Sequence, residues 1–220
     1  MPYRLYEPKG VEGPQPLVLT IGAGGVISGT DNITQLWQIL PMSFVRDDFQ
    51  SEHPCYILTP QNKNVDFNGG WSRKHFDACK AIIRDLIAEG KVDADRIYFA
   101  GEGLGNRLSL LFREPEFFAA AMLTIPVWCD YEMLSTLKDL PIWLTSNAGE
   151  QLRMLERARQ IYQHLVDYGN TQCRLTEYPL DVVEEIGGLY CSRDYHFASM
   201  IAYNDAERRS WLFEHSRAKK

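Results

Sequence analysis

Residues 97–106 have the sequence Ile-Tyr-Phe-Ala-Gly-Glu-Gly-Leu-Gly-Asn. The apolar run over residues 97–100 predicts a buried strand, because short continuous apolar runs are typical of strands that are covered on both faces. Glycine then recurs at every second position from Gly101 to Gly105, which predicts a tight turn. A helical pattern follows over residues 105–113. We therefore expect a strand, a sharp turn and a helix in this order.

The rest of the chain repeats the alternation of strands and helices. Strands are predicted at Tyr3–Pro8 (an edge strand), Leu17–Ile21, Cys55–Pro60, within Phe117–Ile125, and at Pro141–Ser146 and Arg174–Tyr178. Helices are predicted at Lys74–Glu89, which Gly90 ends, at Leu152–Tyr168 and at Asp205–Glu214, and a turn at Asp93–Asp95. This alternation is typical of the α/β class, with a mostly parallel sheet and helices on both faces. We expect one domain over residues 1–220.

Composition narrows the class of function. The net charge is −6, and this acidic balance argues against binding to nucleic acid or to an anionic membrane surface. The apolar runs are too short to cross a bilayer, and the first residues do not resemble a signal peptide. The five cysteines are scattered without metal-ligand spacing, so we expect free thiols, no metal, no cofactor and a cytoplasmic protein.

Four loops are expected at one edge of the predicted sheet. In parallel sheets, binding sites form where the strands end at their carboxyl termini. The loops at Gly22–Gly25, Gly101–Gly105, Ser146–Glu150 and after Tyr178 follow predicted strands, and so share this edge. The first could cradle a phosphate, but no Lys-Ser or Lys-Thr follows it and the dinucleotide-binding spacing is missing. We therefore expect the site among these loops and give phosphate binding little weight.

Several short segments, in order along the chain, are similar to those of one known family. They are Tyr3–Pro8, Gly29–Asn32, His53–Cys55, Pro60–Gln61, Asp95–Tyr98, Phe118–Ala121, Pro141–Trp143, Glu177–Pro179 and Trp211–Phe213. On these segments the chain resembles the α/β-hydrolase esterases often called predicted peptidases, relatives of polyhydroxybutyrate and carbohydrate-ester esterases. The resemblance runs nearly from end to end and implies the α/β-hydrolase fold.

The same resemblance implies where a catalytic site would lie. Residues 101–105 match the nucleophile elbow Gly-x-Ser-x-Gly, with Gly103 at the position of the serine. The matching acid is Glu150, and the matching histidine is His196. The oxyanion and pocket positions are Gly22, Ala23, Glu102 and Leu104, while Ile21 stands where the family has histidine and Asn106 where it usually has glycine.

Glycine at position 103 has no side chain with which to attack a carbonyl carbon. Loss of one member of a triad costs on the order of 10⁴ to 10⁶ in turnover. We therefore expect an esterase- or peptidase-like protein with lost or strongly reduced hydrolysis, whose ligand is a small ester, a glycoside ester or a peptide-like molecule. Two alternatives stay open. The pocket could serve a binding or regulatory protein, or Glu150 and His196 could activate water directly.

Other residues allow two interpretations each. Trp71 and Trp128 could be aromatic platforms at the site or could be buried in the core. Glu102 is expected to face a neighbouring loop or to form a structural salt bridge. The stretch from Leu180 to Tyr195 could fold over the pocket as a lid or remain an exposed loop. The remaining histidines are predicted to have no role in function. They are His53, His75, His164 and His215.

Overall fold

The structure is a computed structural model, and it describes residues 1–22, 29–62, 71–103, 108, 111–126, 129–149, 154–190 and 198–219. For residues 186–190 and 219 it describes the backbone alone. Within these ranges no helix is long and apolar enough to span a membrane.

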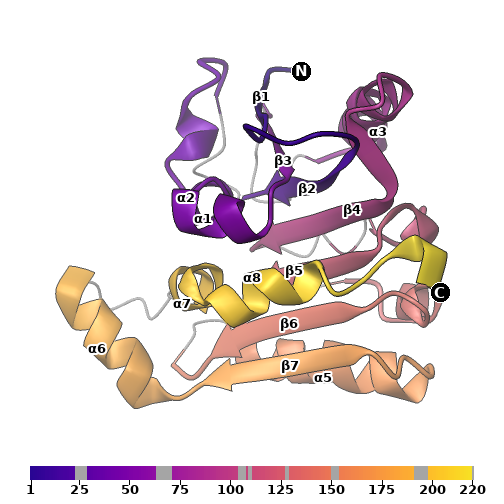
Figure 1. The fold of residues 1–220 in the computed structure, drawn as a ribbon. Coiled ribbons are helices and arrows are strands. Elements are labelled where there is room, and N and C mark those ends of the chain that lie inside the picture. The colour runs from indigo at the N-terminus through magenta and orange to yellow at the C-terminus, as the bar shows by residue number, and fades with distance from the viewer. Residues whose placement is uncertain are drawn as a thin grey trace.

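A seven-stranded sheet forms the centre of the fold (Figure 1). Its strands are β1 (Tyr3–Tyr6), β2 (Gln15–Ile21), β3 (Tyr56–Pro60), β4 (Val92–Glu102), β5 (Ala120–Thr124), β6 (Ile142–Asn147) and β7 (Cys173–Tyr178). Their order in the sheet is β1-β3-β2-β4-β5-β6-β7. Only β1 runs antiparallel to its neighbour, so the predicted edge strand and the mostly parallel sheet are confirmed.

Each central strand is buried on both faces. Side chains alternate between the two faces of a strand, so a strand covered on both sides needs apolar residues at consecutive positions. In β4, Ile97 and Phe99 belong to one core cluster, whereas Tyr98 and Ala100 belong to the other. In β2, Leu17 and Leu19 belong to the first of these clusters, and Val18 belongs to the second. The unbroken apolar runs in the sequence are explained by these two cores.

Helices cover both faces of the sheet. The α-helices are α1 (Ile39–Phe44), α2 (Asp47–Glu52), α3 (Arg73–Ala88), α5 (Met154–Asp167), α6 (Leu180–Tyr190), α7 (Ala198–Asn204) and α8 (Ala206–Leu212). Short 3₁₀ helices lie at η1 (Thr34–Leu36), η2 (Pro115–Phe117), η3 (Glu132–Leu137) and η5 (Arg217–Lys219). Buried residues of α3 and α5 share one core cluster, and those of α1, α2, α7 and α8 share the other. In Figure 1, α7 and α8 cross in front of the sheet.

One prediction for local structure was wrong. Asp93–Asp95 is part of β4, which begins at Val92, rather than a turn. The Asp93 side chain accepts a hydrogen bond from the Asp95 N–H at 2.9 Å, and the register with β2 shifts between Gln15 and Leu17. The residues that predicted a turn therefore form a local side-chain contact within an irregular part of the strand. Helix α7, which begins directly after residue 197, was not predicted.

The segment after β7 also differs from the expected loop. Residues Leu180–Tyr190 form helix α6, which extends away from the body of the molecule in Figure 1. Val183 is buried, while Leu180 is 42% exposed. The predicted lid would include residues 191–195, which lie outside the described residues. The four described cysteines are free thiols, as expected, and Cys55, Cys79 and Cys129 are buried.

Candidate functional site

The carboxyl ends of the parallel strands meet at one edge of the sheet. Strand β2 ends at Ile21, β4 at Glu102, β5 at Thr124 and β6 at Asn147. The parallel pairing of β4, β5 and β6 aligns Glu102 with Thr124 and Thr124 with Thr145. The loops that were predicted to form the site therefore begin close to one another. They lie at the edge of the sheet where α/β proteins form their sites.

The turn after β4 has the backbone geometry of a sharp reversal. Gly103 follows the last residue of β4 and has φ of +79°, a left-handed conformation that residues with a side chain rarely adopt. Its N–H donates to the carbonyl oxygen of Thr124 at 3.0 Å. The end of β5 is also unusual, because Ile125 has φ of +53° and donates its N–H to the Thr145 carbonyl at 2.7 Å. For a residue with a side chain, such as Ile125, backbone strain of this kind costs about 1–3 kcal/mol and is concentrated at functional sites, whereas glycine adopts it at little cost.

A buried carboxylate lies directly before this turn. Glu102 is 8% exposed, and its Oε1 accepts a hydrogen bond from Ser199 Oγ at 2.5 Å. Oxygen–oxygen distances of 2.5–2.7 Å are typical of hydrogen bonds to an ionised carboxylate. Ser199 Oγ also lies 3.2 Å from Oγ1 of Thr124. Among the described residues, Glu102 therefore contacts a hydroxyl group on helix α7.

Two further hydrogen bonds hold α7 against the strand ends. The Tyr203 hydroxyl donates to the Gly101 carbonyl at 2.7 Å, and the Ala198 N–H donates to Oδ1 of Asn147 at 3.1 Å. Complete burial, together with the nearby charge of Glu102, raises the pKa of Tyr203 well above its ordinary value. The phenol therefore stays protonated and remains a hydrogen-bond donor. Helix α7 is joined in this way to the ends of β4 and β6.

The nine predicted site residues divide between the described and the undescribed parts of the chain. Gly22, Glu102, Gly103 and Trp71 are described, and the first three lie at the carboxyl edge. Trp71 is 4% exposed and packs edge-to-face on His75, with ring centroids 5.8 Å apart, so it is a core residue rather than an open platform. The others lie outside the described residues. They are Ala23, Leu104, Trp128, Glu150 and His196.

Two described residues that form these hydrogen bonds lie close in the sequence to His196 and Glu150. Ala198 follows His196 by two residues, and Asn147 precedes Glu150 by three. The hydrogen bond between Ala198 and Asn147 joins these two segments, while Ser199, next to Ala198, joins the segment after His196 to Glu102. Sequence reasoning missed Asn147, Ser199 and Tyr203 as anchors, because the sequence around a polar residue does not reveal a partner that is distant in the chain.

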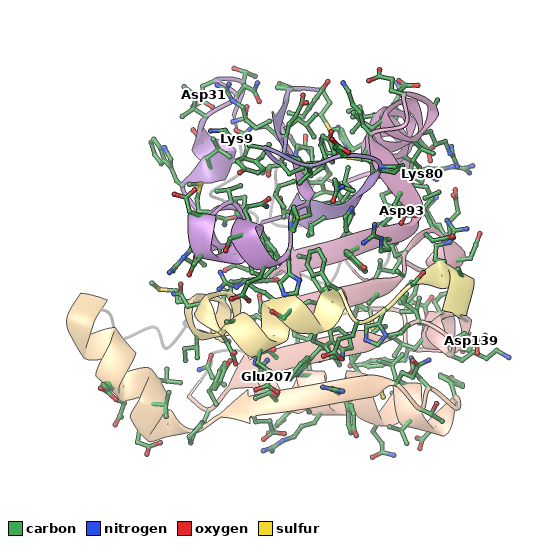
Figure 2. All side chains as sticks on the ribbon, viewed as in Figure 1. Lys9, Asp31, Lys80, Asp93, Asp139 and Glu207 are labelled. Carbon is green, nitrogen blue, oxygen red and sulfur yellow. The ribbon has the colours of Figure 1, made fainter. Side chains whose placement is uncertain are left out.

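An ordered polar cluster follows the glycine loop after β2 (Asp31 is labelled in Figure 2). The Asp31 carboxylate accepts hydrogen bonds from the N–H groups of Ile33 and Thr34, from the Thr34 hydroxyl and from Nε2 of Gln61. These donors, the Thr34 hydroxyl first, hold the pKa of Asp31 well below its ordinary value. Gly29 lies against Gln61, so close that a Cβ atom at position 29 would be 2.8 Å from Nε2. The cluster fixes the point at which the chain leaves the glycine loop.

The chemistry available at the described edge is that of a carboxylate, hydroxyl groups and backbone amides. No group of three or more histidine, cysteine or acidic residues within the described ranges could hold a metal ion. The Gly103 turn and the strand ends resemble the place where a nucleophile and oxyanion donors would meet.

Comparison with known proteins gives no match by sequence and many by structure. No protein-family model matches the chain, and no curated protein matches it. A thermostable esterase superposes with a TM-score of 0.85 and 30% sequence identity, over 97% of this chain and 59% of the esterase. The chain thus spans less than two thirds of that protein's length.

More distant solved structures carry the same fold. The Bacillus cereus carboxylesterase has a TM-score of 0.53 and 14% identity, covering 86% of this chain and 92% of its own. The Pyrococcus horikoshii acylaminoacyl peptidase has a TM-score of 0.55 and 13% identity, covering 88% of this chain and 36% of its own. The sheet, the helices on both faces and these esterase and peptidase neighbours identify the fold as that of an α/β-hydrolase.

Proposed function

We propose that this α/β-hydrolase-fold protein descends from serine esterases and has lost most or all of its ester hydrolysis, because Gly103 stands at the position of the nucleophile. The ligand class that we assign to the pocket is a small ester, a glycoside ester or a peptide-like molecule. The esterase and peptidase neighbours support this class.

One observation carries the proposal. Gly103 keeps the sharp, left-handed turn after the central strand, with φ of +79°, yet offers no side chain to that turn. In the nucleophile elbow the same turn holds a serine hydroxyl at the top of the sheet. The left-handed backbone at position 103 supports an elbow that lacks its reactive group.

The supporting geometry concerns the other two triad positions. Asn147 and Ala198, which flank the segments of Glu150 and His196, are hydrogen-bonded to each other beside the end of β4. This link supports a shared site for Glu150, His196 and position 103. A protein that reuses such a pocket for binding, or one that activates water with Glu150 and His196, would have the same anchors, so activity measurements must separate the three functions.

The decisive variant is Gly103→Ser, assayed with a panel of short-chain aryl esters beside the unchanged protein. We expect the unchanged protein to be inert and the serine variant to hydrolyse esters at least about 100-fold above it, since triad members contribute on the order of 10⁴ or more in turnover. The matched control is Gly103→Ala, which imposes the same backbone strain but supplies no hydroxyl group.

Each outcome assigns a function. Activity in the serine variant that is absent from the alanine variant, and that disappears with His196→Ala, supports the proposed loss at one position. If both variants are inert while folded, the oxyanion side at Ile21 or the Glu150–His196 pair has also decayed, which favours a binding role. Ester turnover by the unchanged protein that requires His196 would contradict the proposal and favour activation of water.

A further inference from the structure

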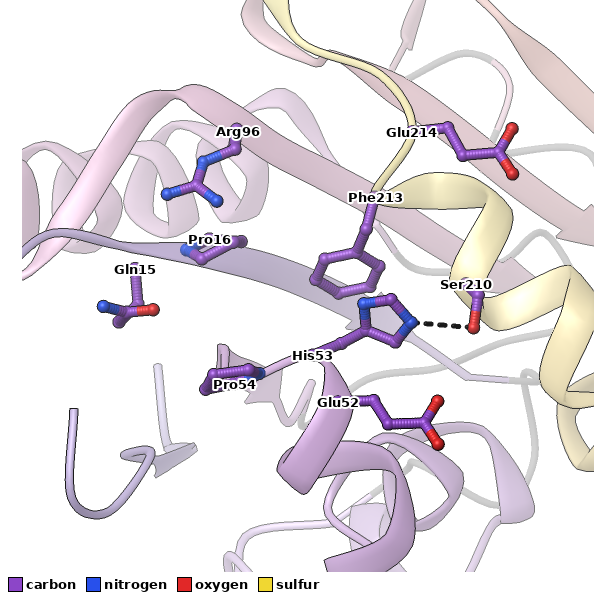
Figure 3. A pocket seen from close by; sticks show the side chains of 9 residues that line it. All are labelled: Gln15, Pro16, Glu52, His53, Pro54, Arg96, Ser210, Phe213 and Glu214. Carbon is purple, nitrogen blue, oxygen red and sulfur yellow. Dashed lines mark hydrogen bonds between the residues drawn. The ribbon is translucent and has the colours of Figure 1, made fainter.

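A cavity lies at the amino-terminal edge of the sheet, among residues of β2, β4, α2 and α8 and the residues that follow these helices (Figure 3). Its volume is about 370 Å³, within the usual range of about 300–1,000 Å³ for small-ligand pockets. Gln15 at the start of β2 and Arg96 in the first half of β4 form one side. The ends of α2 and α8 form the other. The cavity is therefore built from the amino-terminal parts of the strands, far along them from Gly103.

An aromatic pair forms the middle of this cavity. The rings of His53 and Phe213 are stacked, with centroids 4.9 Å apart and planes inclined by 28°. Nε2 of His53 lies 2.9 Å from Ser210 Oγ, which fixes the imidazole against α8. Partial burial lowers the pKa of His53, with Arg209 adding to the effect and Glu52 opposing it. The lowered pKa favours the neutral imidazole, so the pair presents a mainly uncharged aromatic surface.

Charges of opposite sign flank the aromatic pair. In Figure 3 the Arg96 guanidinium lies on the side of Gln15, whereas the carboxylates of Glu52 and Glu214 lie on the side of Ser210. Arg96 donates from Nε to Asp93 at 2.6 Å and from Nη2 to the Pro14 carbonyl at 3.4 Å. No hydrogen bond from its Nη1 to the described residues is present, so this donor group is available to a ligand.

The helices add to the negative side of the cavity. Glu52 is the last residue of α2, and Phe213 is the C-cap residue of α8, so both helices end at the cavity wall. The carboxyl end of a helix carries a partial negative charge and favours a cation nearby. Two carboxylates and two helix ends therefore favour a positive group on this side, while the guanidinium favours an anionic group on the other.

We propose that this cavity binds a short zwitterionic ligand, a dipeptide with free termini. Its carboxylate pairs with Arg96, its ammonium group lies near Glu52 and Glu214, and an apolar side chain packs on Phe213 and His53. A dipeptide fits the arrangement better than a single amino acid, because the aromatic pair separates the two charged sides. The termini of an extended dipeptide are roughly 7 Å apart, whereas both charges of an amino acid are attached to one carbon.

The test is a titration of the full chain with alanyl-phenylalanine, followed by NMR signals of the His53 imidazole and the Phe213 ring. We expect saturable shifts of both signals at millimolar concentration or below. N-acetylation or C-amidation of the dipeptide removes one charged hydrogen bond, so each is expected to weaken binding about tenfold. Free phenylalanine is expected to bind less tightly than the dipeptide.

Variants assign the two ends of the ligand. Arg96→Gln should abolish the difference between the free and the amidated dipeptide, and Glu52→Gln with Glu214→Gln should abolish the difference between the free and the acetylated one. Arg113→Gln and Glu116→Gln, which change exposed charges elsewhere, are the matched controls and should leave both ratios unchanged. Because each readout is a ratio measured within one variant, partial unfolding does not imitate the effect.

Three results would overturn the proposal. The first is the absence of saturable shifts at millimolar dipeptide, and the second is equal binding of the free and both capped forms. The third is a response that spares His53 and Phe213 while signals elsewhere in the protein move. None of these results depends on whether the protein hydrolyses esters.

Discussion

At the scale of single residues, the hydroxyl of Ser199 connects two strand ends to a helix. It donates to the Glu102 carboxylate at 2.5 Å and lies 3.2 Å from the Thr124 hydroxyl. Both Glu102 and Ser199 are more than 90% buried. A carboxylate that is this deeply buried needs hydrogen-bond donors, because its charge has lost most of its contact with water. Ser199 therefore holds α7 in place through the charge of Glu102.

We predict that Ser199→Ala destabilises the protein by about 1–3 kcal/mol, the usual cost of removing a hydrogen bond to a buried charged group. Urea denaturation measures the change in the free energy of unfolding. Ser135→Ala is the matched control, because the Ser135 hydroxyl makes an exposed contact with the Glu132 carbonyl. A Ser199→Ala variant as stable as this control would show that Glu102 does not depend on the hydroxyl group.

At the scale of elements, α3 and α5 end in the same way. After α3, Gly90 has φ of +73°, its N–H donates to Ile87, and the Lys91 N–H donates to Leu86. After α5, Gly169 has φ of +90° and the next residue donates to Leu165. This paired pattern satisfies the last carbonyl groups of a helix and requires a left-handed residue, usually glycine.

We predict that Gly90→Ala and Gly169→Ala each destabilise the protein by roughly 1–2 kcal/mol, the cost of a left-handed conformation for a residue with a Cβ atom. No atom lies within 4 Å of a Cβ built at either position, so steric overlap adds nothing to this strain. Asparagine at the same positions should cost less, since it tolerates this conformation better. Chemical denaturation of the four variants tests the order, and alanine variants at least as stable as the parent would refute it.

At the scale of the whole molecule, β2 and β4 lie near the centre of the sheet, and helices cover both of its faces. Each of these strands is paired on both sides, and Leu17, Leu19, Ile97 and Phe99 are fully buried. By contrast, β1 pairs only with β3, and its Tyr3 side chain is 40% exposed. Local opening is easiest where few apolar contacts and few strand pairings hold the backbone.

We therefore predict that hydrogen-bonded amides of β2 and β4 exchange with solvent only through global unfolding. Those of β1 should exchange faster, through local opening of the edge. Native-state hydrogen exchange at increasing denaturant concentrations measures the opening free energy of each amide. Equal opening free energies in β1 and β2 would mean that the edge strand opens only together with the central sheet.

Much of the fold could be predicted from the sequence because its signals are local. The apolar runs of β2, β3, β4 and β6 predicted buried strands, and the apolar spacing of α3 and α5 predicted helices at nearly their observed limits. Gly90 predicted the end of α3, because the left-handed residue after a helix is usually glycine. The edge position of β1 also followed from its alternating pattern.

The errors arose where a contact between distant residues decides the structure. Asp93–Asp95 has a turn-like composition, yet these residues lie within β4, between Val92 and Ile97, which are both paired with β2. Helix α7 has too few residues for a clear period, and contacts from Asn147, Glu102 and Gly101 hold it in place. The position of His53 in the cavity at the amino-terminal edge also depends on a distant contact, with Ser210 of α8.

For the candidate site, the sequence by itself determined the identity of Gly103 and thus the absence of a hydroxyl group there. It also determined the glycine spacing that allows the turn, because glycine adopts positive φ at little cost. Only the tertiary structure decided that Glu102 is hydrogen-bonded to Ser199, that Trp71 is buried, and that opposite charges flank the cavity at the amino-terminal edge. Such features join residues that are far apart in the chain, and chain folding alone brings them together.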